Sequence, residues 1–133
     1  MSYLLDTHAL LWTLFEPGKL RKQVRSIIAD RENVVFVSAI SFWEISLKFS
    51  LRKLELPKTQ PEELPKAVTE MGFSIAELTP DLLASYYKLE IDSDHRDPFD
   101  RLLVWQAIQN RFCLISKDTG LQFYRKQGLQ TLW

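Results

Sequence analysis

The sequence predicts an α/β fold in which helices flank a mostly parallel central sheet of about five strands. Short apolar and β-branched runs alternate along the chain with longer stretches whose apolar residues recur at helical spacing. No internal repeat, low-complexity tract or glycine-rich linker interrupts this alternation. A chain of 133 residues can bury one sizeable core, so we expect a single domain over residues 1–133.

The first half of the chain begins with a short apolar strand, "SYLL", and continues by alternation. Its predicted elements are a strand over 2–5, helices over 8–16 and 19–30, a strand over 33–38, and helices over 39–54 and 61–72. Pro17 and Gly18 stop the first helix. The run "NVVFVS" is too short for a helix, which indicates a buried strand. The apolar stripe from Ile40 to Leu51 predicts a helix that persists until Pro57 breaks it.

The second half of the chain predicts the same alternation. Its elements are a strand over 73–78, a helix over 79–90, a helix that begins near Asp97, a strand over 113–116, a short helix around 120–127, and a last strand over 129–133. Thr79 is the expected N-cap of its helix, with Pro80 at the first helical position. Such alternation implies a parallel sheet covered on both faces, and open parallel sheets bind ligands beyond the carboxyl ends of their strands.

Bulk composition limits the function classes. Lys and Arg together number 17, as do Asp and Glu, so nucleic-acid binding driven by net charge is not expected and would need a local basic patch. The single cysteine, Cys113, can form no internal disulfide, which agrees with a reducing compartment. The apolar N-terminal stretch lacks a basic region and is interrupted by Asp6 and His8, so we do not interpret it as a signal peptide. No run is long enough to span a membrane, and we expect a cytoplasmic protein.

Four acidic residues lie where this topology would bring them together. Asp6 ends the first strand, and Asp118 follows the fourth strand. Glu44 lies early in the helix after the second strand, and Asp100 opens the helix before the fourth. Because the carboxyl ends of parallel strands share one rim, we expect these side chains to meet there. Each also has a simpler interpretation at a helix start, Asp6 and Asp118 as caps and Glu44 in a capping box with Ser41.

The segment "SDHRDPFDRLLVWQA" (93–107) contains a further acid, Asp97. With Asp97 as N-cap, Pro98 at the first position and Asp100 in the first turn, it has the form of an ordinary helix start. A helix would also bring Asp97 and Asp100 together, and two carboxylates about 4 Å apart repel by about 4 kcal/mol at an effective dielectric of ~20. A cluster of this kind requires a cation or shared protons, and an all-oxygen ligand set favours Mg²⁺ or Mn²⁺.

Four motifs together, "YLLDTHALLW", "SFWEIS", "DPFDRLLVWQA" and "ISKDT", resemble those of the PIN-domain ribonucleases, specifically the VapC-type toxins of toxin–antitoxin pairs. The resemblance covers nearly the whole chain, with the motifs in the right order and at family-like spacing. It implies an acidic pocket that holds Mg²⁺ or Mn²⁺ and metal-dependent endonucleolytic cleavage of RNA. It also implies a small antitoxin protein that occludes the pocket, and a homodimer.

The resemblance assigns expected roles by position. The four acids of the family correspond to Asp6, Glu44, Asp100 and Asp118, which are the expected catalytic residues and metal ligands. Asp97 matches an additional acid of members with "DPFDR", and the sequence leaves open whether it contacts the metal, the substrate or only the helix terminus. Three hydroxyl residues are expected to orient acids or waters behind the ligands: Thr7, Ser41 and Thr119. Three cations are candidates for steering RNA phosphates, although they could equally balance the charge of the acids: Arg96, Arg101 and Lys117.

The two histidines, His8 and His95, belong to a residue type that binds metals and transfers protons. Asp6-x-His8 is too short to define a motif, and we expect His8 to face the following helix; His95 shares the acidic loop, and neither is assigned to the site. Two rival functions remain: a Mg-dependent phosphoryl-handling α/β domain, and a non-catalytic protein-binding module with the same fold. A receiver domain would want paired acids after the first strand, and a haloacid-dehalogenase-type phosphatase would want an Asp in place of His8.

Overall fold

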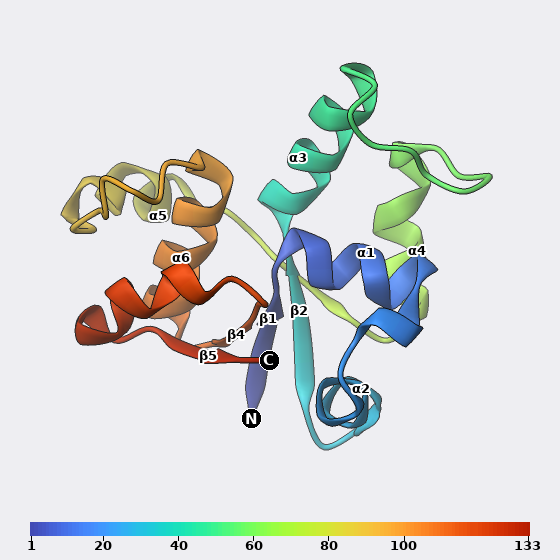
Figure 1. The fold of residues 1–133 in the computed structure, drawn as a ribbon, viewed down its shortest axis with the longest axis horizontal. Coiled ribbons are helices and arrows are strands. Elements are labelled where there is room, and N and C mark those ends of the chain that lie inside the picture. The colour runs from blue at the N-terminus through green and yellow to red at the C-terminus, as the bar shows by residue number, and fades with distance from the viewer.

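A computed structural model describes residues 1–133. Its five strands form one parallel sheet in the order β3-β2-β1-β4-β5 (Figure 1). The strands are β1 (Ser2–Leu5), β2 (Val34–Ser38), β3 (Ser74–Ala76), β4 (Cys113–Ile115) and β5 (Gln130–Leu132). The predicted α/β class with a parallel central sheet is confirmed, and every strand lies within the range expected from the sequence.

Helices and 3₁₀ segments occupy the connections between strands. The α-helices are α1 (Thr7–Phe15), α2 (Lys22–Ala29), α3 (Ala39–Ser50), α4 (Leu64–Glu70), α5 (Pro80–Ala84) and α6 (Pro98–Asn110). The 3₁₀ segments are η1 (Pro17–Lys19), η2 (Pro61–Glu63), η3 (Ser85–Lys88) and η4 (Thr119–Gln127). None of the helices has the length and apolar character needed to cross a membrane.

The helix predicted over 39–54 is shorter in the structure, where α3 ends at Ser50. Arg52 adopts the left-handed conformation, with φ of 57°. The backbone N–H of Lys53 then bonds back to the carbonyl of Lys48 at 2.9 Å, which closes the last turn. The helix therefore ends through its own C-terminal backbone geometry, several residues before the proline that was expected to break it.

The segment predicted as one helix over 79–90 divides into α5 and η3. Its start is as expected, since the Thr79 hydroxyl accepts a hydrogen bond from the N–H of Leu82 at 3.1 Å. The carbonyl of Leu82 accepts bonds from the indole N–H of Trp105 at 3.1 Å and the hydroxyl of Ser85 at 3.0 Å. These side chains occupy a carbonyl that a continuing α-helix would use, so the chain tightens into a 3₁₀ turn.

Different helices cover the two faces of the sheet. Helices α1, α2 and α4 lie on one side, and α5, α6 and η4 lie on the other (Figure 1). Successive residues of β1 point to opposite faces, so Tyr3 and Leu5 join the core on the α1 side while Leu4 joins the core under α6. Cys113 is buried in the first of these cores, as a structural residue.

The order of the strands creates a crevice beside β1. The chain adds β2 and β3 on one side of β1, then crosses to add β4 and β5 on the other side. Helices leave β1 and β4 toward opposite faces, which opens a space at the carboxyl ends of these two strands. Asp6 directly follows β1, and Asp118 follows β4, so the topology places both residues at this edge.

Candidate active site

A hollow of about 360 Å³ lies at the carboxyl ends of β1 and β4. Asp6, Asp100 and Asp118 line it, from the end of β1, the first turn of α6 and the segment after β4. The remaining lining residues are His8, Trp12 and Lys117. A larger hollow, of about 700 Å³, lies at the amino ends of β2 and β3, the edge of a parallel sheet where ligand sites are not expected.

Asp6 caps α1 and faces the hollow at the same time. Its Oδ1 accepts a hydrogen bond from the N–H of Ala9 at 2.7 Å. Burial raises the pKa of Asp6, and the nearby charge of Glu44 adds to this, while hydrogen bonds from Ser116 and Ala9 oppose it. One oxygen is thus committed to the helix start, and the carboxylate is held in surroundings that disfavour its charge.

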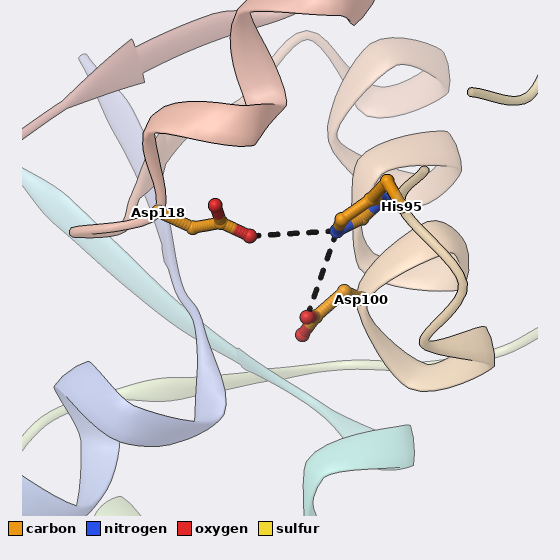
Figure 2. A group of neighbouring side chains, drawn as sticks. All are labelled: His95, Asp100 and Asp118. Carbon is orange, nitrogen blue, oxygen red and sulfur yellow. Dashed lines mark ion pairs between the residues drawn. The ribbon is translucent and has the colours of Figure 1, made fainter. Parts of the chain in front are cut away.

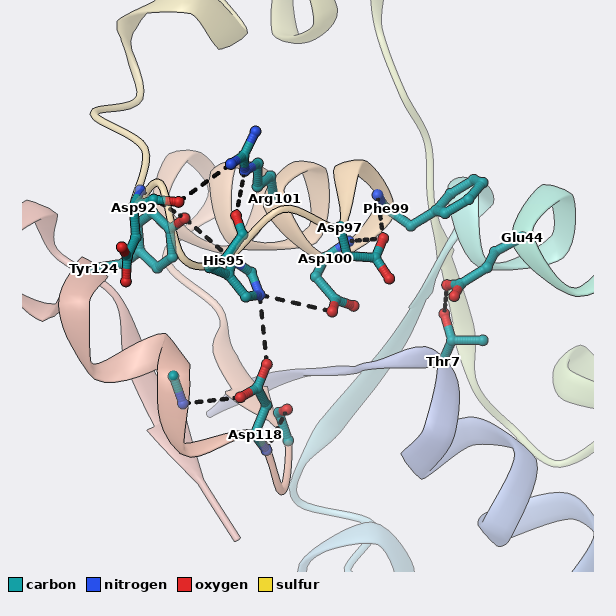
Figure 3. A network of polar contacts seen from close by, with 12 residues as sticks. Thr7, Glu44, Asp92, His95, Asp97, Phe99, Asp100, Arg101, Asp118 and Tyr124 are labelled. Carbon is teal, nitrogen blue, oxygen red and sulfur yellow. Dashed lines mark hydrogen bonds and ion pairs between the residues drawn. The ribbon is translucent and has the colours of Figure 1, made fainter.

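Glu44 is the buried acid of the site, with 3% of its surface exposed. The Thr7 hydroxyl lies 2.5 Å from its Oε1 (Figure 3). The same hydroxyl lies 3.1 Å from the hydroxyl of Ser41. Because a hydroxyl has one hydrogen, Thr7 donates to the carboxylate and accepts from Ser41. Ser38 rather than Ser41 caps α3, so the capping-box interpretation of Ser41 and Glu44 is wrong.

Lys48 is a cation of this site that the sequence analysis did not identify. Its ammonium forms an ion pair with Oε2 of Glu44. Burial by itself lowers the pKa of Lys48, but the hydrogen bond and charge of Glu44, with further contributions from Asp97 and Asp100, outweigh burial and raise it. The i, i+4 spacing of Glu44 and Lys48 in a helix is the sequence signal for this pair.

Asp97 and Asp100 share the start of α6 but have different surroundings. The Oδ1 of Asp97 accepts hydrogen bonds from the N–H groups of Phe99 at 2.8 Å and Asp100 at 3.4 Å, which makes Asp97 the N-cap (Figure 3). Burial raises the pKa of Asp100 to about 7, together with the repulsion of four other acids. These acids are Asp97, Glu44, Asp6 and Asp118. The charge of every predicted acid therefore reaches Asp100.

Asp118 also divides its two oxygens between a cap and the hollow. Its Oδ1 accepts from the N–H of Gly120 at 2.8 Å, at the start of η4. Its Oδ2 lies 3.4 Å from Nε2 of His95. Thr119 is exposed and its hydroxyl makes no hydrogen bond to these acids, so the structure does not bring it into the expected supporting position.

His95 is the second site residue that the sequence analysis left out. Its Nε2 points between Asp118 and Asp100, 3.4 Å and 3.7 Å from their Oδ2 atoms (Figure 2). The other histidine, His8, is exposed and lies beside Trp12, with 6.1 Å between ring centroids. The position of His95 inside the acidic loop was the available signal, but loop geometry cannot be read from residue spacing.

The three predicted cations differ in position. Arg101 donates from Nε to the carbonyl of His95 at 2.6 Å and from Nη2 to that of Asp92 at 3.2 Å, so its guanidinium closes the loop before α6 (Figure 3). Arg96 is exposed and donates to the carbonyl of Ser93 at 3.0 Å. Lys117 lines the hollow. Of the three, Lys117 is the one that shares the hollow with the acids, and its ammonium lies 5.7 Å from the ring centroid of Trp12.

The donor set of the hollow fits a divalent cation. Three carboxylates line it, and the Nε2 of His95 is buried without a hydrogen-bond partner. Ligand atoms of His95, Asp100 and Asp118 all lie within 4.8 Å of one another. A cation bound among them would relieve the repulsion that raises the pKa of Asp100.

The chain with this strand order and acidic hollow is similar to known proteins in both sequence and fold. The PIN domain matches residues 3–129, nearly the whole chain. The chain belongs to the PIN domain family. It is similar to Ribonuclease VapC22 from Mycobacterium tuberculosis, with 28% identity over 135 residues that cover 99% of this chain and 98% of that protein.

Solved structures share the fold of this PIN domain. VapBC2 from Rickettsia felis, bound to a DNA fragment from its promoter, superposes with a TM-score of 0.71 at 17% identity and covers 100% of this chain and 99% of that chain. VapBC-1 from nontypeable Haemophilus influenzae gives 0.63 at 18% identity, covering 99% and 97%. FitAB bound to the IR36 DNA fragment gives 0.59 at 20% identity, covering 99% and 94%. At these identities the likeness concerns the fold.

Asp100→Asn is expected to stabilise the cation-free PIN domain at pH 8. The pKa of Asp100 is about 7 in the folded protein against an ordinary 3.8, so the folded state binds this proton more tightly and loses stability as the pH rises through that interval. The amide carries no charge at any pH. In chelator, calorimetry should show a melting temperature about 3 °C or more above wild type at pH 8 and a smaller difference near pH 4.5. Asp81→Asn on α5 should show no such pH dependence, and equal melting temperatures at pH 8 would contradict the assignment.

Lys48→Met is expected to destabilise the domain, because it leaves the buried carboxylate of Glu44 without its cation. Urea denaturation in chelator should show a loss of about 2 kcal/mol. The double variant Glu44→Gln with Lys48→Met removes the uncompensated charge and should recover most of this loss. Lys66→Met is the matched control, since Lys66 forms an exposed i, i+4 pair with Glu70 and should change stability by less than about 0.5 kcal/mol.

Proposed function

We propose that this PIN domain is a metal-dependent endoribonuclease that acts as the toxin of a toxin–antitoxin pair. The observation that carries the proposal is the convergence of Asp6, Asp100 and Asp118 in one hollow, where the pKa of Asp100 rises to about 7. Acids held together at this cost are suited to a divalent cation and to phosphodiester hydrolysis. The similarity to Ribonuclease VapC22 along the whole chain supports the choice of RNA as substrate.

The acids of the hollow have different roles in the proposed reaction. We assign Asp6, Asp100 and Asp118 as ligands of Mg²⁺ or Mn²⁺, with Glu44 as the acid behind them. A cation held by these residues would supply Lewis-acid chemistry for the phosphoryl group and would lower the pKa of a bound water. Thr7 fixes the orientation of Glu44 through its 2.5 Å contact. A carboxylate that is already oriented adds no reorganisation free energy to the reaction barrier.

Asp97 and the cations have supporting parts in this proposal. Asp97 holds the first turn of α6 and thereby directs Asp100 into the hollow. Lys117 lies where it can attract an RNA phosphate toward the acids. Arg96, exposed in the loop before α6, offers a second contact for the RNA backbone, while Arg101 keeps that loop in place.

A groove beside the hollow suits the antitoxin. It has a volume of about 400 Å³, lies between α1 and α3, and shares His8 and Trp12 with the acidic hollow. Its apolar lining includes Leu11, Phe15 and Leu54. We propose that a small antitoxin protein binds along this groove and covers the acids, so that the nuclease is silent in the cytoplasm until the antitoxin is lost.

We also propose that the chain forms a homodimer. Leu83, Tyr87 and Ile91 are large apolar side chains exposed near one another in sequence on α5, η3 and the following loop, with Tyr87 79% exposed. Burying such residues against a second copy removes apolar surface from water.

Incubation of the purified chain with total RNA tests the nuclease assignment. Cleavage should occur with Mn²⁺ or Mg²⁺ and stop in EDTA, and Asp6→Asn should lose about 100-fold or more of the activity because it removes a charged ligand. Asp81→Asn, the same chemical change at an exposed position on α5, should keep wild-type activity. Full activity of Asp6→Asn, or cleavage that persists in EDTA, would show that the acids are not the catalytic centre.

Expression in a bacterial host tests the toxin role. Wild-type chain expressed without a partner should arrest growth, because unopposed cleavage of RNA stops protein synthesis. The Asp6→Asn variant, made in equal amounts, should leave growth unaffected. Normal growth in the presence of soluble chain that cleaves RNA in vitro would separate the nuclease from the toxin and refute the second part of the proposal.

A further inference from the structure

His95 has a ring nitrogen that the fold buries but does not satisfy. Its side chain is 10% exposed, and Nε2 has no hydrogen-bond partner. A buried polar atom without a partner reduces the stability of a fold by about 1–3 kcal/mol. Such atoms are rare in native structures, and each one calls for a specific explanation. In Figure 2, this nitrogen points into the space between Asp100 and Asp118.

The orientation of the imidazole is built into the structure. Its Nδ1 lies 3.2 Å from the hydroxyl of Tyr124, a residue with no exposed surface in η4. The same hydroxyl accepts the N–H of Asp92 at 3.3 Å, and Arg101 donates to the carbonyl of His95 at 2.6 Å (Figure 3). The ring is therefore held from its outer side and from its own backbone, and Nε2 is aimed at the acids.

The distances around Nε2 suit a shared cation better than a direct ion pair. A charge-assisted N–H···O bond spans about 2.7–2.9 Å, whereas Nε2 is 3.4 Å from Asp118 and 3.7 Å from Asp100. Two atoms that each lie about 2.1 Å from one ion can be at most about 4.2 Å apart. Both observed separations lie within that limit.

The partner of Nδ1 completes the chemical argument. When Nδ1–H donates to the oxygen of Tyr124, Nε2 presents its lone pair to two carboxylates. The lone pair and the carboxylates repel one another, and a cation bound between them would turn this repulsion into attraction. Metal-binding imidazoles commonly donate their other N–H to an oxygen that fixes the ring. Tyr124 supplies that oxygen from the core.

We propose that His95 is a direct nitrogen ligand of the divalent cation in this hollow, alongside Asp100 and Asp118, and that it makes the site prefer Mn²⁺ to Mg²⁺. This inference rests on the proposed metal-dependent function and specifies its cofactor. Mg²⁺ selects oxygen ligands, while imidazole suits the first-row transition ions. The carboxylates alone do not distinguish Mg²⁺ from Mn²⁺. One imidazole nitrogen among them favours Mn²⁺.

Pulsed EPR of Mn²⁺ bound to the full chain tests the ligand directly, because a coordinated imidazole nitrogen couples to the metal electron spin. The coupling should be present in the wild type, absent in His95→Gln and retained in His8→Gln. These variants alter the chain's two histidines, so each is the control for the other. Calorimetry should show Mn²⁺ affinity reduced about 10-fold or more in His95→Gln, with a smaller change for Mg²⁺.

Uniform replacement of histidine nitrogen by ¹⁵N in the wild-type chain repeats the EPR test without any substitution. The coupling pattern must change with the isotope if histidine binds the ion, whatever the stability of the variants. Bound Mn²⁺ with no nitrogen coupling, or coupling lost in His8→Gln and kept in His95→Gln, would overturn the assignment of His95 and leave the nuclease proposal standing. Absence of any Mn²⁺ binding would overturn both.

Discussion

Repulsion among carboxylates is the constraint on which the site depends. A parallel sheet delivers the carboxyl ends of β1 and β4 to one edge, and α6 begins above the same edge. This topology brings Asp6, Asp118 and Asp100 together in one hollow. Burial and the repulsion between the acids raise the pKa of Asp100 to about 7. Because β1 and β4 are neighbours in the sheet, the strand order holds Asp6 and Asp118 at the same edge, and compensation for their charges must come from other groups.

Helix capping and function are compatible at this site because a carboxylate has two oxygens. Asp6 and Asp118 each commit Oδ1 to a backbone N–H, at 2.7 Å and 2.8 Å, while both side chains line the hollow. Asp97 is different, since its Oδ1 accepts from two N–H groups at the start of α6. The caps fix the torsion of each acid, which converts a repulsive group of flexible side chains into a set of donors with defined positions.

The sequence alone predicts the features that depend on local pattern and topology. It does not predict the direction of a side chain whose position depends on loop conformation. The parallel sheet follows from alternation, and the placement of Asp6 and Asp118 follows from the ends of their strands. His95 could not be placed, because its direction comes from the contacts of Nδ1 with Tyr124 and of its carbonyl with Arg101, 29 and 6 residues away. The end of α3 was missed for a related reason, since backbone bonds rather than Pro57 terminate it.

The protein compensates its acids in two different ways. Glu44, the most buried, receives a cation from the chain itself, because Lys48 pairs with one oxygen while Thr7 bonds to the other. Asp100 and Asp118 form no ion pair with a lysine or arginine of the chain, and the side chain between them is His95, whose Nε2 has no hydrogen-bond partner. A built-in ammonium suits an acid that must stay in place, whereas an exchangeable ion suits acids that must also meet substrate. An added cation is therefore needed for the acids that line the hollow, and not for Glu44.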